Sequence, residues 1–106
     1  MIIKTGIVIT NLKGEPIKNE DVEIMLGEVL SNILLADKSG GKMKMFVLAE
    51  KLFKAKNQIE LDKADFALIK TSVEKTEIYG NLINGQALLI LEAIKDKDLP
   101  KEEKKV

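Results

Sequence analysis

The strongest constraint on the fold is a regular apolar stripe in the first third of the chain. Its large apolar residues recur at steps of three and one: Val22, Met25, Leu26, Val29, Leu30, Ile33 and Leu34. This spacing places them on one face of a helix and predicts an amphipathic helix over about residues 26–36. Leu30 lies at the centre of the stripe and is predicted to be in the core.

The start of this stripe has two interpretations. Val22, Ile24 and Leu26 alternate with other residues, which suits a second strand that pairs back as a hairpin. Alternatively, the helix extends back to Glu20, where acidic side chains would suit the positive end of the helix dipole. The sequence leaves both interpretations open.

The remaining pattern predicts a mainly α fold with a small β element. Residues 2–10 are β-branched and apolar and predict one strand, followed by a turn at Gly14 and Pro16. Three further helices are predicted over roughly 42–55, from Asp62 to about Lys75, and over 78–95. The expected architecture is therefore an N-terminal strand or hairpin followed by about four short helices around one core. We expect one helical domain over 1–95 and a charged, flexible tail over 96–106.

Each later helix has a predicted inward face. The second helix would bury Met45, Leu48, Ala49, Leu52 and Phe53. The third would bury Phe66, Leu68 or Ile69, and Val73. The last would bury Ile78, Leu82, Ile83, Leu89, Ile90, Ala93 and Ile94, with Leu88 and Leu91 widening its apolar stripe.

The residue types that are absent restrict the chemistry. The chain has no Cys, no His and no Trp, and all 17 basic residues are Lys. It therefore lacks the commonest general base, thiolate nucleophiles, the usual zinc ligands and a bidentate guanidinium clamp. We expect no catalytic residues, no metal site and no cofactor, and hence no enzyme.

The charge balance disfavours a general polyanion binder. Seventeen acidic residues offset the 17 lysines, so the formal net charge is zero. Lys44, Lys51 and Lys54 recur at helical spacing and form the best candidate anion-binding face, although such runs usually mark a solvated surface. Phe46 and Phe53 are assigned to the core, which leaves no aromatic residue beside these lysines for base stacking.

The polar clusters have structural explanations. Glu60, Asp62 and Asp65 lie within six residues, but Asp62 suits a helix N-cap better than a cation loop. Tyr79 and Gln86 are seven residues apart on the last helix and are a weak candidate for a small polar pocket. No segment reads as a signal peptide or a membrane span, so the expected location is the cytoplasm, with no membrane partner.

The last helix suggests self-association. Its apolar residues occupy more of its circumference than one core can cover, and a helix that is apolar nearly all round must be buried nearly all round. The candidate self-association face is Ile78, Leu82, Leu88 and Leu91. A homodimer or higher closed oligomer is expected.

Four phrases carry a family resemblance: NLKGEPI, LGEVLSNILLA, IELDKADFALIK and NGQALLILE. Their order and spacing over about residues 8–92 resemble small proteins of tailed bacteriophages and prophages. The resemblance implies an accessory or assembly protein that contacts other phage or host proteins in a bacterial cytoplasm. The function expected is thus a non-enzymatic, self-associating protein-interaction module. The alternative is a small nucleic-acid-binding regulator.

Overall fold

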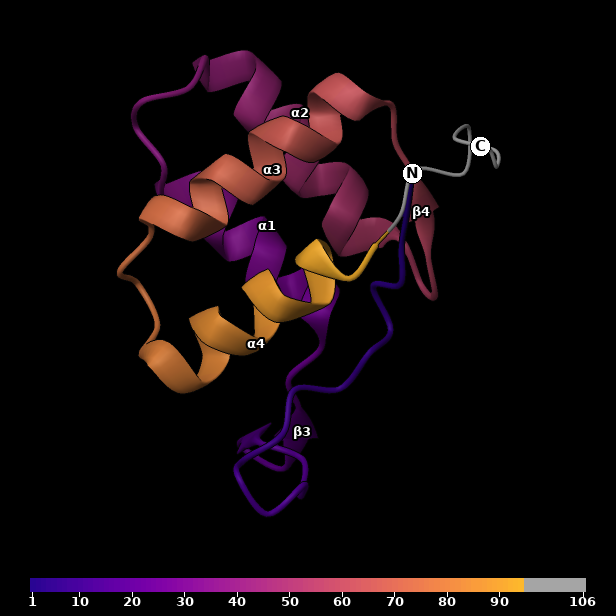
Figure 1. The fold of residues 1–106 in the computed structure, drawn as a ribbon, viewed down its shortest axis with the longest axis vertical. Coiled ribbons are helices and arrows are strands. Elements are labelled where there is room, and N and C mark those ends of the chain that lie inside the picture. The colour runs from indigo at the N-terminus through magenta and orange to yellow at the C-terminus, as the bar shows by residue number, and fades with distance from the viewer. Residues whose placement is uncertain (95–106) are drawn as a thin grey trace, which may run out of the picture.

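Four helices follow a small N-terminal β element in the computed structural model of the protein, which describes residues 1–94 (Figure 1). The helices are α1 (Leu26–Ala36), α2 (Lys42–Lys54), α3 (Lys63–Lys75) and α4 (Asn81–Glu92). The predicted fold class is confirmed, and α1 begins and ends where its apolar stripe indicated. The predicted tail over 96–106 lies outside the described residues.

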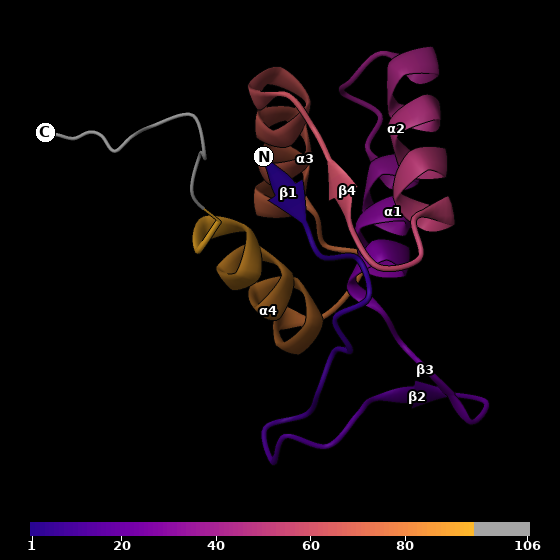
Figure 2. The same ribbon diagram turned by 90° about the vertical axis from the view of Figure 1, so that its right-hand side faces the viewer.

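Helix α1 is the centre of the core because it contacts each of the other three helices. Its apolar stripe is fully buried from Leu26 to Leu34, and Leu30 is in the core as predicted. Figure 2 shows α2 on one side of the molecule and α4 on the other, with α1 beside α2 and α3 above α4. Both outer helices therefore have one side against the core and one side that no described helix covers.

The strand interpretation is correct for Val22–Glu23, and the helical extension to Glu20 is wrong. Strands β2 (Lys18–Asn19) and β3 (Val22–Glu23) form an antiparallel hairpin. The two turn residues, Glu20 and Asp21, have φ angles of 52° and 69°. Two consecutive positive φ angles match the tight turn that suits the twist of a hairpin and cannot belong to a right-handed helix. The hairpin projects away from the helices (Figure 2).

The predicted single strand over residues 2–10 is interrupted. Only β1 (Ile2–Ile3) is a strand, and it pairs antiparallel with β4 (Ile59–Glu60) from the loop between α2 and α3. The chain then turns at Thr5 and Gly6, where the Ile7 N–H donates to the Lys4 carbonyl at 3.3 Å. The Thr5 hydroxyl donates to the Ala55 carbonyl at 3.0 Å. Beyond the turn, Ile9 N–H donates to the Ile24 carbonyl at 2.9 Å, which ties this segment to the hairpin.

Small residues let α1 and α2 pack closely. A Cβ atom on Gly27 would lie 2.9 Å from the Leu52 carbonyl oxygen and 2.9 Å from Thr5 Cβ, so only glycine fits there without movement. One turn later, the buried Ser31 hydroxyl donates to the Ala49 carbonyl at 2.9 Å. Gly27 and Ser31 therefore serve the packing of the fold. By contrast, a Cβ on Gly85 of α4 would meet open space.

Candidate interaction surfaces

The outer face of α4 is apolar and exposed. We define it by Leu82, Gly85 and Leu89, which are three and four residues apart and so share one side of the helix. Leu89 is 70% exposed. A hollow of about 490 Å³ lies between this face and the loop after Thr10, where Leu12 is 95% exposed. Exposed leucines from two segments therefore border one depression.

Gln86 fixes the loop against α4. The Thr10 N–H donates to Gln86 Oε1 at 3.1 Å, and Gln86 Nε2 donates back to the Thr10 carbonyl. A side-chain amide that both donates and accepts in this way replaces the partner strand that Thr10 lacks on this side. Tyr79 lies elsewhere, since its hydroxyl accepts a hydrogen bond from Asn32 Nδ2 at 2.9 Å. Gln86 and Tyr79 have separate packing roles.

The register predicted for α4 is partly wrong. Leu91 was placed on the candidate self-association face, but it is fully buried, together with Ala87 one turn earlier. Leu89, predicted to face inward, points outward instead. The reason is that leucine and isoleucine cover most of this helix, so the sequence pattern did not distinguish the core side from the outer side. Of the four predicted face residues, Ile78 and Leu82 are exposed, Leu88 is half-buried and Leu91 is in the core.

The outer face of α2 is also apolar, which corrects a second prediction. Phe46 and Phe53 were assigned to the core, but they are 57% and 67% exposed. The core side of α2 is complete without them, since Met45, Leu48, Ala49 and Leu52 are buried there as predicted. The exposed apolar side chains are Met43, Phe46, Val47 and Phe53 on α2 and Leu35 on α1. We call these five residues the basic apolar face, because lysines surround them.

The lysines of α2 are partly neutralised by ion pairs. Lys44 Nζ lies 2.7 Å from Asp65 Oδ1 of α3, and this hydrogen-bonded pair raises the pKa of Lys44. Lys54 Nζ lies 3.1 Å from Glu50 Oε2 on the same helix. Two of the three lysines of the predicted anion-binding face, Lys44, Lys51 and Lys54, are therefore already paired with carboxylates.

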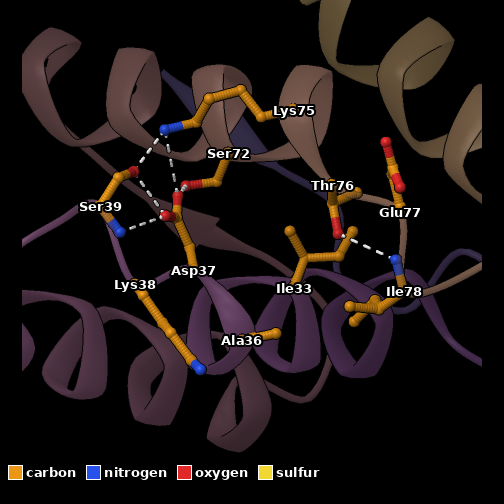
Figure 3. A pocket seen from close by; sticks show the side chains of 10 residues that line it. All are labelled: Ile33, Ala36, Asp37, Lys38, Ser39, Ser72, Lys75, Thr76, Glu77 and Ile78. Atoms are coloured by element: carbon orange, nitrogen blue, oxygen red, sulfur yellow. Dashed lines mark hydrogen bonds and ion pairs between the residues drawn. The ribbon is translucent and has the colours of Figure 1, made fainter.

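A cluster of polar side chains joins the carboxyl ends of α1 and α3 (Figure 3). The Asp37 carboxylate accepts hydrogen bonds from the Ser39 hydroxyl and the Ser72 hydroxyl, both at 2.6 Å. These hydrogen bonds, with Lys75 Nζ 3.7 Å away, hold the pKa of Asp37 well below its usual range. The cluster borders a depression of about 440 Å³.

The contact between Ser39 and Lys75 in this cluster resembles the pairing of a nucleophile with a base, but it cannot work as one. Lys75 Nζ donates to Ser39 Oγ. A general base must instead accept the serine proton. The Ser39 hydroxyl itself donates to Asp37. The cluster is therefore a clasp that holds the loop after α1 against α3.

The acidic residues near α3 cap the helix. Asp62 Oδ1 accepts a hydrogen bond from the Asp65 N–H at 2.8 Å, so the predicted N-cap is confirmed. Within residues 1–94, no three acidic side chains are placed to hold a metal ion. In the same part of the chain, no helix is both long and apolar enough to cross a bilayer.

No family model, curated protein or solved structure matches the chain.

Proposed function

We propose that this protein is a non-enzymatic interaction module that self-associates through the outer face of α4. The observation that carries the proposal is that α4 exposes Leu82 and Leu89 while Ala87 and Leu91 already complete its core side. A solvent-exposed leucine pair beside a hollow is typical of a contact surface.

The charge distribution supports a second copy as the partner. From Ile78 to Leu91 the sequence contains no charged residue. Two copies related by a two-fold axis bring identical patches together, so an uncharged patch meets its own image without repulsion. The spare apolar side of α4 would then be covered in a homodimer or a higher closed oligomer. The resemblance to small phage and prophage proteins, with an accessory or assembly role, stays a prediction.

Light scattering during size-exclusion chromatography tests this proposal. We expect the parent protein to have about twice the 11.8 kDa mass of one chain at high loading concentration, or a larger multiple. Leu89→Glu should reduce the mass to that of one chain, because it places a charge at the centre of the contact. Phe53→Glu is the matched control, since Phe53 is similarly exposed but lies on α2. A parent mass of one chain at every concentration would contradict the proposal, as would dissociation by the control alone.

A small nucleic-acid-binding regulator is the second candidate. It is favoured by the exposure of Phe46 and Phe53 beside lysines, since aromatic rings next to cations can stack on unpaired bases. The ion pairs of Lys44 and Lys54 and the zero net charge weigh against it. Titration with labelled duplex and single-stranded DNA at physiological salt distinguishes the regulator from the interaction module. We expect at most weak, unspecific binding to either DNA.

A further inference from the structure

We propose that the basic apolar face of α2 docks an acidic amphipathic helix of a different protein. This inference concerns a surface on the opposite side of the molecule from α4 and does not depend on self-association. It rests on three observations: an exposed apolar stripe, a concentration of positive charge around it, and a hollow between α1 and α2.

The basic apolar face is not needed to hold α2 in the described part of the fold. Met43 is 80% exposed, and Phe46 and Phe53 are more than half exposed, although α2 is anchored by a separate set of buried residues. Large aromatic and methionine side chains are the residues that most often anchor a protein contact. Keeping several of them in water on one helix is consistent with selection for a binding surface.

Positive charge is concentrated around this stripe. Six lysines and a single acidic residue, Glu50, lie between residues 38 and 56 of a protein whose formal net charge is zero. Within residues 1–94, four of those lysines form no ion pair: Lys38, Lys42, Lys51 and Lys56. At its Phe46 end the face therefore presents apolar anchors beside the unpaired Lys38 and Lys42, whereas at its other end Glu28 of α1 lines the same depression as Phe53 and Lys56.

The positive charge around the face disfavours a second copy of the chain and favours an acidic partner. Across a two-fold axis the lysines of one copy would oppose those of the other, and like charges in a contact repel each other. A partner with carboxylates beside its apolar residues instead gains attraction and faster association.

The shape of the surface favours a helix. A hollow of about 380 Å³ lies between α1 and α2, walled by Leu34, Leu35 and Phe46. Lys38 and Lys42 also line it, and Figure 3 shows the Lys38 side chain directed away from the Asp37 cluster. A helix laid along such a groove inserts an apolar side chain, and carboxylates one turn away can reach the two ammonium groups.

Two other classes of partner fit less well. An anionic membrane would have to cover the ion pair of Glu50 and Lys54, which lies in the middle of the stripe, and burying an ion pair in an apolar medium is costly. A nucleic-acid strand can stack on Phe46 and Phe53, but it offers nothing apolar to Leu35, Met43 and Val47. An acidic helix uses both the apolar side chains and the lysines.

The test uses two labelled synthetic helical peptides of about 18 residues, a length of five turns. Both carry leucine at positions i, i+3, i+4 and i+7, and the residues beside the leucines are glutamate in one peptide and lysine in the other. Fluorescence anisotropy with the full chain at low salt should show at least about tenfold tighter binding of the glutamate peptide. Phe46→Ser should abolish that binding, whereas Leu89→Ser on α4 should leave it unchanged.

A charge-reversed variant makes the test specific. Lys42→Glu combined with Lys51→Glu should abolish the preference, because residues 38–56 change from six lysines and one glutamate to four lysines and three glutamates. Both positions are exposed, and an unchanged melting temperature confirms that the fold is retained. Equal binding of the two peptides by the parent protein, or an unchanged preference in the variant, would overturn the proposal. Tighter binding to phosphatidylserine vesicles or to oligothymidylate than to the glutamate peptide would also overturn it. Light scattering reports on α4 alone, so a failure here is separable from a failure of self-association.

Discussion

Helices α2 and α4 both have two apolar sides, but the charge around their outer sides differs. The outer face of α4 lies within a stretch without charged residues, whereas that of α2 is surrounded by lysines. Exposed apolar area marks a candidate contact surface, but it does not identify the partner. The charges around that area decide whether a copy of the same chain or a chain of opposite charge is the better partner.

The inner and outer sides of the two helices should respond very differently to truncation. Leu52→Ala on α2 and Leu91→Ala on α4 should each lower the free energy of unfolding by about 2–5 kcal/mol, because both side chains are fully buried. Their outward counterparts, Phe53→Ala and Leu89→Ala, should each change it by less than about 0.5 kcal/mol in the monomer. Urea denaturation at low protein concentration measures all four. A large loss for either outward variant would mean that its face is covered within the chain.

Gly27 lies in a close helix contact and Gly85 lies on an open surface, so an alanine substitution should have opposite effects at the two positions. Gly27→Ala should cost about 1–3 kcal/mol, because the new methyl group would clash with the Leu52 carbonyl at the contact of α1 with α2. Gly85→Ala should stabilise the monomer by about 0.5–1 kcal/mol, because alanine is the better helix former and the site is open. Thermal unfolding of the two variants checks both signs. A destabilised Gly85→Ala monomer would show that the outer face of α4 is more crowded than the structure indicates.

The Asp37 clasp connects α1 with α3. Helix α2 packs against α1, and α4 packs against α3 and α1. Asp37→Asn should lower the free energy of unfolding by about 1–2 kcal/mol near neutral pH, because it removes charge-assisted hydrogen bonds to Ser39 and Ser72. The pKa of Asp37 is lowered in the folded state, so its contribution is present above the unfolded value of 3.8 and is lost as the pH falls below it. Denaturation from pH 7 to pH 2 should show the parent and the variant converging. A constant difference across that range would argue against the clasp.

Salt concentration should have a small effect that differs between the two outer faces. The screening length falls from about 10 Å at 0.1 M salt to about 3 Å at 1 M. Binding of the acidic peptide to α2 should therefore weaken by about tenfold over this range, while the mass of the α4 assembly should stay constant. Anisotropy and light scattering at matched salt concentrations measure the two effects. A salt-sensitive assembly mass would place the lysines of α2 in the self-association contact.

Much of the fold followed from local patterns. The stripe of α1 predicted both the helix and its burial, because every apolar residue in it lies on a single side. Asp62 predicted the start of α3, because the N-cap hydrogen bond involves only residues next to one another in the sequence. The clasp of Ser39, Ser72 and Asp37 gave no sequence signal, because its members are distant along the chain and belong to common residue types.

By itself, the sequence determined the four helices, the small β element and the lack of the usual catalytic side chains. It did so because helix periodicity and residue chemistry are local properties. The tertiary structure decided which sides of α2 and α4 face the core. On α4, leucine and isoleucine surround the helix, and only the contact with α1 and α3 selected Ala87 and Leu91 for burial. On α2, Phe46 and Phe53 are as apolar as their buried neighbours, and they stay in water because they lie on the side of the helix away from the buried Met45, Leu48, Ala49 and Leu52.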